Sequence, residues 1–200
     1  MKVSEAIKSR RSVRHFDPNY VMPEQEIKEF FEAAMCAPTS FNIQNWRFVV
    51  VTDKEQKAKL RAAAWDQSQV EDASITIVLC ADLKAWDKTP ERYWKDTPKE
   101  VQDFLVPMIK PFYEGKEQLQ RDEAMRSIGF AAQNLMLLAK EKGYDSSPMI
   151  GFDPEQFAKI LNLPKDYVIG MMISIGKATK PSVANPGRIG YDEAVYRDKF

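Results

Sequence analysis

The stretch from Gln118 to Lys142 predicts a helix so long, and so apolar along one side, that the rest of the chain must be built around it. Its apolar side chains recur every three or four positions, at Ile128, Ala131, Ala132, Leu135, Leu138 and Ala139. This spacing places the side chains in one apolar stripe along a helix of about seven turns. Gly143 then supplies a helix stop. We therefore predict a single long core helix.

Shorter elements precede and follow this helix. Runs rich in β-branched and aromatic residues predict three strands, at Trp46 to Val51, Ser74 to Ala81 and Val168 to Ile175. Capping residues or prolines predict helices at Val3 to Arg10 with Ser4 as the cap, from Pro23 to Pro38, from Asp53 to about Trp65, and after Asp153. In the last of these, Pro154 takes the first helical position and Gln156 completes a capping box.

Two segments do not fit this regular pattern. Residues 84 to 115 contain four prolines, which predict short or kinked helices. This segment is the best candidate for a substrate lid. Residues 177 to 200 combine prolines and glycines with few apolar residues, so they cannot form a core of their own. They are expected to hang free or to lie on another surface.

Composition indicates one globular domain spanning residues 1–200. The chain is 44% hydrophobic, and a chain of this length buries about 70% of the surface that its unfolded form exposes. Its 29 basic and 29 acidic residues cancel. No overall field therefore attracts it to nucleic acid or to an anionic membrane. Its apolar runs are far shorter than the roughly 20 residues that cross a bilayer. We expect neither nucleic acid nor membrane as a partner.

Few side chains of this sequence are suited to catalysis. Cys36 and Cys80 are isolated among apolar neighbours and predict reduced, packed thiols. His15 is the only histidine, which excludes a zinc site with two histidines, and we predict no metal. The first residues carry no apolar stretch typical of a secretory signal, so a cytoplasmic protein is expected. Such a chain favours chemistry carried by a cofactor.

The basic cluster after the first helix is a candidate anion site. Arg10, Ser12 and Arg14 are alternate residues of a predicted extended segment, so they would project to one side. Two guanidinium groups and one hydroxyl suit a phosphate, which arginine binds with two hydrogen bonds. The alternative is a solvated basic turn.

Three polar loops are candidates for contact with a planar ring. Ser40, Asn42 and Gln44 alternate between a helix and a strand, and Gln67 and Gln69 precede another strand. Amides offer both donors and acceptors to the edge of a heterocycle, although both loops could equally be ordinary turns. In the loop SSPMIGFD, Gly151 would let the main chain approach a flat ligand, whereas a simple helix connector would need no such approach.

In this order along the chain, these motifs resemble those of the nitroreductase family of flavin mononucleotide (FMN) enzymes. The resemblance covers most of the chain, and no dinucleotide-binding or P-loop glycine motif competes with it. The matching segments are RRSVRHF at residues 10–16, APTSFNIQNWRF at 37–48, QSQVEDAS at 67–74, SPMIGFD at 147–153, and Arg188 in the tail.

This resemblance implies an α+β fold, with a mainly antiparallel sheet between helices. It implies a homodimer in which residues 177–200 form an arm on the partner subunit. Arg188 would then join the phosphate contacts. The loop from Pro38 to Asn42 would reach the flavin held mainly by the other subunit. The FMN-binding residues implied are Arg10, Arg11, Ser12, Arg14, Pro38, Thr39, Ser40, Asn42, Gln67, Gln69, Pro148, Met149, Ile150, Gly151 and Arg188.

The resemblance also implies the reaction. NADH or NADPH would deliver hydride to flavin N5, and a nitroaromatic or quinone acceptor would then take its place in a ping-pong cycle. No protein nucleophile is required, and the main chain of Ile150 and Gly151 would support N5. Within the same family a reductive dehalogenase is an alternative, as is an oxidase. From another class, the chain could be a flavin- or nucleotide-binding module without turnover, or a purely structural dimer that binds no flavin.

Overall fold

A single antiparallel sheet lies at the centre of the computed structural model, which describes residues 1–200. Its strands stand in the spatial order β1-β2-β4-β3, and every neighbouring pair is antiparallel. The strands are β1 (Trp46–Val51), β2 (Ile75–Asp82), β3 (Asp145–Met149) and β4 (Tyr167–Gly176). The predicted α+β class and antiparallel sheet are confirmed.

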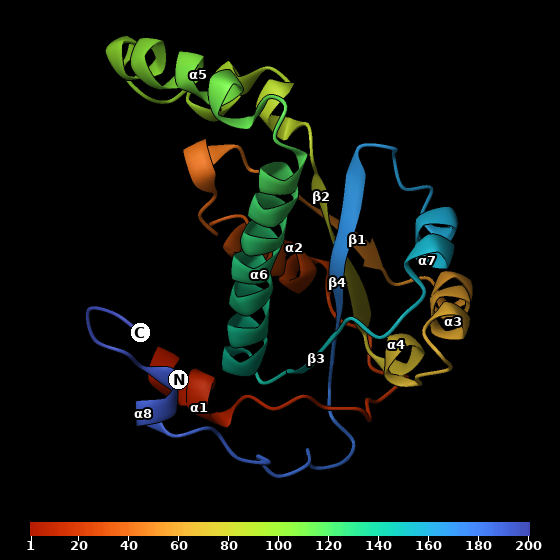
Figure 1. The fold of residues 1–200 in the computed structure, drawn as a ribbon. Helices are drawn as coiled ribbons and strands as arrows, with labels where there is room; N and C mark the ends of the chain where they lie inside the picture. The colour runs from red at the N-terminus through yellow and green to blue at the C-terminus, as the bar shows by residue number, and fades with distance from the viewer.

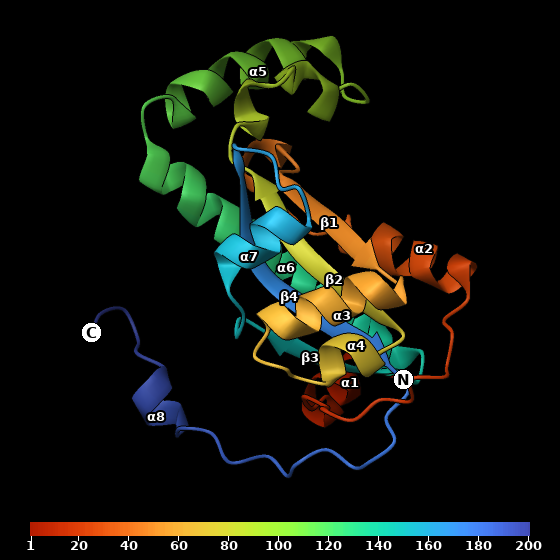
Figure 2. The same ribbon diagram turned by 90° about the vertical axis from the view of Figure 1, so that its right-hand side faces the viewer.

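Helices cover both faces of this sheet (Figures 1 and 2). One face carries the long helix α6 with α2, and the other carries α3 and α7. The α-helices are α1 (Val3–Ser9), α2 (Glu24–Ala34), α3 (Lys54–Ala63), α4 (Gln69–Asp72), α5 (Lys99–Tyr113), α6 (Glu117–Glu141), α7 (Pro154–Ile160) and α8 (Tyr191–Ala194). Single 3₁₀ turns are η1 (Ser40–Asn42), η2 (Ala85–Asp87) and η3 (Pro90–Tyr93).

Strand β2 shows how the sequence produces this layering. All eight of its residues are buried, because successive side chains point to opposite, covered faces. Ile77 and Leu79 pack in the cluster that includes Phe30 and the apolar stripe of α6. Val78 and Cys80 pack in the second cluster, with residues of α3 and α7. The predicted core helix is therefore confirmed as the main cover of one face.

Several local predictions need correction. Lys2, not Ser4, occupies the N-cap of α1, and Ser4 lies inside the helix. The stretch Asp145–Met149 is an edge strand, although residues 146–149 were predicted as loop. Pro148 obscured it in the sequence, yet proline is tolerated on an edge because one side of the strand needs no ladder hydrogen bond.

The cap at Asp153 forms as predicted, with its carboxylate accepting the main-chain N–H of Glu155 and Gln156. The capping box is incomplete. Gln156 donates to the carboxylate of Asp153, while the main-chain N–H of Asp153 goes to the carbonyl of Ala63. The hydrogen bonds that the Asp153 carboxylate accepts, above all that from the Gln156 N–H, hold the pKa of Asp153 below its usual range.

The segment from 84 to 115 contains one helix longer than expected. Helix α5 has 15 residues and runs through both Pro107 and Pro111, so the prolines do not keep it short. Figure 1 shows α5 projecting from the end of the sheet. Its apolar side chains Val101, Phe104, Met108 and Phe112 remain exposed.

The tail leaves the body as expected. It is anchored where Ala178 bridges Phe16 and the Thr179 N–H donates to the His15 carbonyl over 3.0 Å. From Val183 to Phe200 every residue is exposed, and both views show this segment extending away from the sheet (Figures 1 and 2).

The two cysteines differ. Both are free, and Cys80 is buried in the sheet, where desolvation raises the pKa of its thiol to about 12. Cys36 is exposed at the end of α2, so the expectation that it packs in the core is wrong. No helix combines the length and apolarity needed to cross a membrane.

Gly176, the last residue of β4, provides a test of how closely the end of β4 packs against its neighbours Ser74 and Phe16. A methyl group there would lie 2.9 Å from the main-chain nitrogen of Ser74 and 3.1 Å from a ring carbon of Phe16. We expect Gly176→Ala to lower the free energy of unfolding by about 1 to 3 kcal/mol, because the backbone must shift to admit it. Chemical denaturation measures this. Gly190→Ala is the matched control, since nothing lies within 4 Å of that position, and equal stability of the two variants would contradict the packing described.

Candidate functional site

The basic segment after α1 lies against the outer edge of β3. Ser12 forms a parallel bridge with Ser146, and the main-chain N–H of Val13 donates to the Ser146 carbonyl over 3.1 Å. The edge strand is thereby covered on its open side. Val13 is buried, whereas Ser12 and Arg14 are exposed on the other side of the extended chain, as their alternation predicts.

This segment and β3 carry polar groups that the chain itself does not satisfy. One guanidinium nitrogen of Arg10, Nη1, is buried without a hydrogen-bond partner, and so is the hydroxyl of Ser146. A buried polar group without a partner costs about 1 to 3 kcal/mol, so such groups call for a ligand or water. Arg11 is different, because its Nη1 donates to the carbonyls of Lys8 and Arg10.

The loop after β3 meets the loop between α3 and α4. Gln67 Nε2 donates to the Gly151 carbonyl over 2.9 Å. Gln69 is buried, and its Nε2 reaches Gln67 Oε1 at 3.2 Å and the Met149 sulfur at 3.5 Å. Both predicted amides therefore lie beside the 148–151 loop.

The same loop is shaped for close approach by the main chain. A methyl group on Gly151 would lie 3.0 Å from Trp65 Cζ3 and 3.3 Å from Gln67 Nε2, so only glycine fits there without displacement. The main-chain N–H groups of Ile150 and Gly151 donate no hydrogen bond within the chain. The side chain of Ile150 is 76% exposed. The loop therefore presents two main-chain N–H groups that are free to donate hydrogen bonds, next to an exposed surface.

Backbone strain is concentrated in two of the predicted polar loops. Eight residues other than glycine have positive φ, a conformation that costs energy for L side chains. Five of them lie in these loops or directly before them: Phe41, Asn42, Gln44, Trp65 and Asp66. Strain of this kind persists where the surrounding structure fixes it, and it is frequent at ligand sites.

The loop from Pro38 to Asn42 lies far from the basic segment of the same chain. The Ser40 N–H donates to Glu123 near the start of α6 over 2.9 Å, and Asn42 Nδ2 donates to the Tyr93 carbonyl over 2.7 Å. From Glu123 to the end of α6, beside β3, the helix rises by about 27 Å. Figure 1 shows η1 toward the α5 end of α6 and α1 at its opposite end. One chain does not bring these two groups together.

Arg188 stands apart from both groups. It lies in the exposed tail, and its Nη1 hydrogen-bonds only to neighbours, Asn185 Oδ1 at 2.8 Å and the Gly187 carbonyl at 2.7 Å. Within a single chain, the predicted contacts therefore occupy three places.

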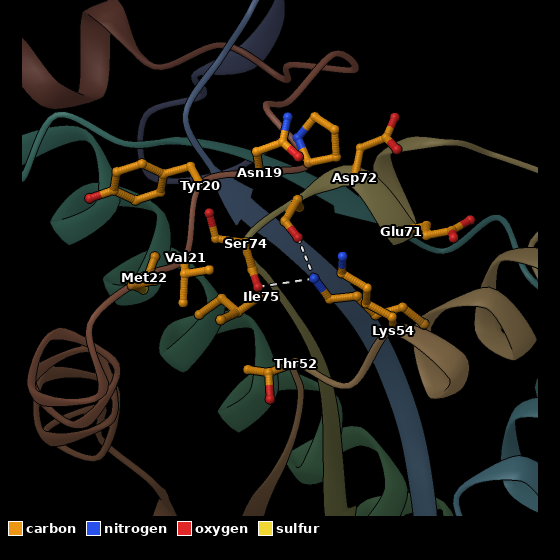
Figure 3. A pocket seen from close by; sticks show the side chains of 13 residues that line it. Asn19, Tyr20, Val21, Met22, Thr52, Lys54, Glu71, Asp72, Ser74 and Ile75 are labelled. Carbon is orange, nitrogen blue, oxygen red and sulfur yellow. Dashed lines mark hydrogen bonds between the residues drawn. The ribbon is translucent and has the colours of Figure 1, made fainter.

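A separate hollow of about 230 Å³ contains none of the predicted residues (Figure 3). The ammonium group of Lys57 donates to the carbonyls of Ala73 and Ser74 on its wall, and burial lowers the pKa of Lys57. Its charges are balanced, because Glu71 and Asp72 stand opposite Lys54 and Lys57. We interpret this hollow as structural.

The groups gathered around the 148–151 loop fit FMN. The segment holding Arg10, Ser12 and Arg14 offers cationic and hydroxyl donors to a phosphate, with one guanidinium nitrogen already buried and unpartnered. The amides and the free N–H groups at the C-terminal end of β3 and in the loop after it suit the polar edge of a planar ring. Trp65, which is 71% exposed beside Gly151, adds a flat apolar surface that the sequence interpretation missed.

Comparison with known proteins supports this interpretation. The model of a family described as the nitroreductase family matches residues 7–177. Protein DrgA of Synechocystis is 51% identical over 194 residues, covering 94% of this chain and 92% of that protein. A Thermus thermophilus protein named NADH dehydrogenase is 32% identical and covers 84% and 82% of the two chains. A crystal structure from Exiguobacterium sibiricum, solved in complex with FMN, superposes with a TM-score of 0.91 at 34% identity, covering 98% and 97%.

Proposed function

Because the chain belongs to the nitroreductase family, we propose that it is an FMN-dependent NAD(P)H oxidoreductase that works as a homodimer and reduces nitroaromatic or quinone-type acceptors. The observation that carries this proposal is that Nη1 of Arg10, in the basic segment, and the hydroxyl of Ser146, in the strand along whose edge that segment runs, are both buried without a hydrogen-bond partner. A related structure containing FMN supports the choice of cofactor.

We propose that a second copy of the chain completes the site. The Pro38 to Asn42 loop and Arg188 lie away from the basic segment within one chain, so they are free to serve the flavin of the partner. Large apolar side chains are exposed on α1 and α6 and along the tail, as expected for surfaces that pair: Val3, Ile7, Phe130, Ile189, Tyr191, Tyr196 and Phe200.

Each group of residues then has a task. Arg10, Ser12 and Arg14, joined by Arg188 of the partner subunit, hold the phosphate. Gln67 and Gln69 face the ring or its ribityl chain, and the N–H groups of Ile150 and Gly151 hydrogen-bond to the ring edge. The loop surface at Ile150 stays exposed, so reactants can approach the ring there.

When bound, FMN supplies the redox chemistry, accepting reducing equivalents from NAD(P)H and passing them to the acceptor in a ping-pong cycle. The protein contributes binding and orientation, and no side chain acts as a nucleophile. A cytoplasmic location is proposed, since the reductant is supplied there.

The decisive experiment is an absorbance spectrum of the purified, FMN-reconstituted protein before and after anaerobic addition of NADPH. We expect a yellow protein that bleaches with NADPH and recovers its colour when a quinone is added. A protein that stays yellow would be a binding module without turnover. A protein that takes up no FMN would overturn the proposal altogether.

A further inference from the structure

A second cavity lies between the loop that precedes β1 and the turn that follows η3. Its volume is about 660 Å³, within the usual range for small-molecule sites. Gln44, Trp46 and Arg47 line one wall, and Arg92 and Lys95 line the other. The hydrogen bond from Asn42 to the Tyr93 carbonyl ties the two walls together.

Positive charge dominates this cavity. Its lining has three cationic side chains and one acidic one, Asp96. Arg47 is partly neutralised, because its Nη2 lies 4.0 Å from the carboxylate of Asp82. Arg92 stacks on the Tyr93 ring at 4.6 Å and donates only to the Tyr93 hydroxyl. Lys95 forms no ion pair or hydrogen bond within the chain. Two cations on the same wall are therefore available to an anion.

Trp46 provides an independent sign of a missing ligand. The residue is 6% exposed, and its indole N–H is buried without an acceptor. An indole N–H can only donate, so what it lacks is an acceptor atom such as an oxygen. Arginine, lysine and indole donors together match the oxygens of a phosphate group.

We propose that this cavity binds the phosphate groups of the nicotinamide dinucleotide reductant. The inference rests on the proposed function, in which the Asn42 loop borders a flavin, so the cavity opens beside the position where a nicotinamide would stack. Among the reactants of that function, only the dinucleotide must carry phosphates, whereas nitroaromatics and quinones need none. The segment from 84 to 115 thereby gains a role in selecting the reductant.

Steady-state kinetics of the FMN-reconstituted protein tests this inference. The variant combines Arg92→Ala with Lys95→Ala, both exposed positions whose loss should not disturb the core. Lys99→Ala is the control, because that lysine is also exposed and cationic but its ion pair is with Asp103, outside the cavity. The reductants are NADPH, NADH and reduced 1-benzylnicotinamide, which has the same reacting ring but no phosphate.

We expect the KM for the dinucleotides to rise about tenfold or more in the double variant, with kcat within about twofold of the parent. The KM for the benzyl compound should not change. Inorganic pyrophosphate should inhibit the parent by competing with NADPH, and it should inhibit the double variant only weakly. If the KM rises for NADPH alone, the cavity holds the 2′-phosphate. If the KM rises for both NADPH and NADH, the cavity holds the diphosphate.

Two results would overturn the inference: unchanged KM values for both dinucleotides, or an equal rise for the benzyl compound. Failure of the proposed function looks different. In that case the parent protein would not be bleached by any of the three reductants.

Discussion

Replacing Arg14 by alanine weakens FMN binding about tenfold to a hundredfold, while turnover of the variant saturated with FMN stays close to that of the parent. A charge-assisted hydrogen bond to phosphate contributes on the order of 1.5 to 3 kcal/mol, which corresponds to this loss of affinity. Arg14 is exposed and makes no contact that the fold needs, so its loss should not destabilise the apoprotein. Titration of the apoprotein with FMN, followed by flavin fluorescence, measures the dissociation constant.

Arg10→Ala should act in the same direction. Because its Nη1 is buried without a partner, truncation removes an unsatisfied group from the apoprotein but a phosphate contact from the FMN complex. Lys165→Ala, an equal loss of charge in the turn before β4, is the control and should bind FMN like the parent. If both arginine variants also kept the parent affinity, the phosphate assignment would be untenable.

The parts of the site that the sequence predicted share one property. Apart from Arg188, which only the family resemblance supplied, each consists of residues close together in the chain, such as Arg10 to Arg14 or Gln67 and Gln69, whose chemistry is visible in a short window. The parts that were missed arise from tertiary contacts. Trp65 becomes relevant only because Gly151 packs against it, and the cationic cavity joins Arg47 to Arg92 across 45 positions.

The fold shows the same division. The strand Trp46–Val51 and the cap at Asp153 were predicted from local propensity, and both are confirmed. Strand β3 was missed because Pro148 opposes it locally, while pairing with β4 on one side and with Ser12 on the other stabilises it. Helix α5 persists through two prolines for a related reason, since Ile109 and Tyr113 on its inner side are fully buried. Burial outweighs local preference in both cases.

The largest effect is expected when the chain is ended after Pro181. The anchor at Ala178 and Thr179 remains, and the part removed has no core residues, since everything from Val183 onward is exposed. The truncated chain should therefore keep its secondary structure and nearly all of the thermal stability of one subunit. It should nevertheless lose the apolar arm that we propose to clasp the partner.

In light scattering after size exclusion, we expect the full chain to have about twice the mass of its 23.0 kDa subunit and the truncated chain to have the mass of one. FMN affinity should fall more than about a hundredfold, because the truncation removes both Arg188 and the Pro38 to Asn42 loop of a partner. Arg188→Ala in the full chain separates these causes. That variant should stay dimeric and lose only the contribution of one charged contact, about tenfold or somewhat more. A truncated chain that remains a dimer with unchanged FMN affinity would show that the arm serves neither the interface nor the phosphate.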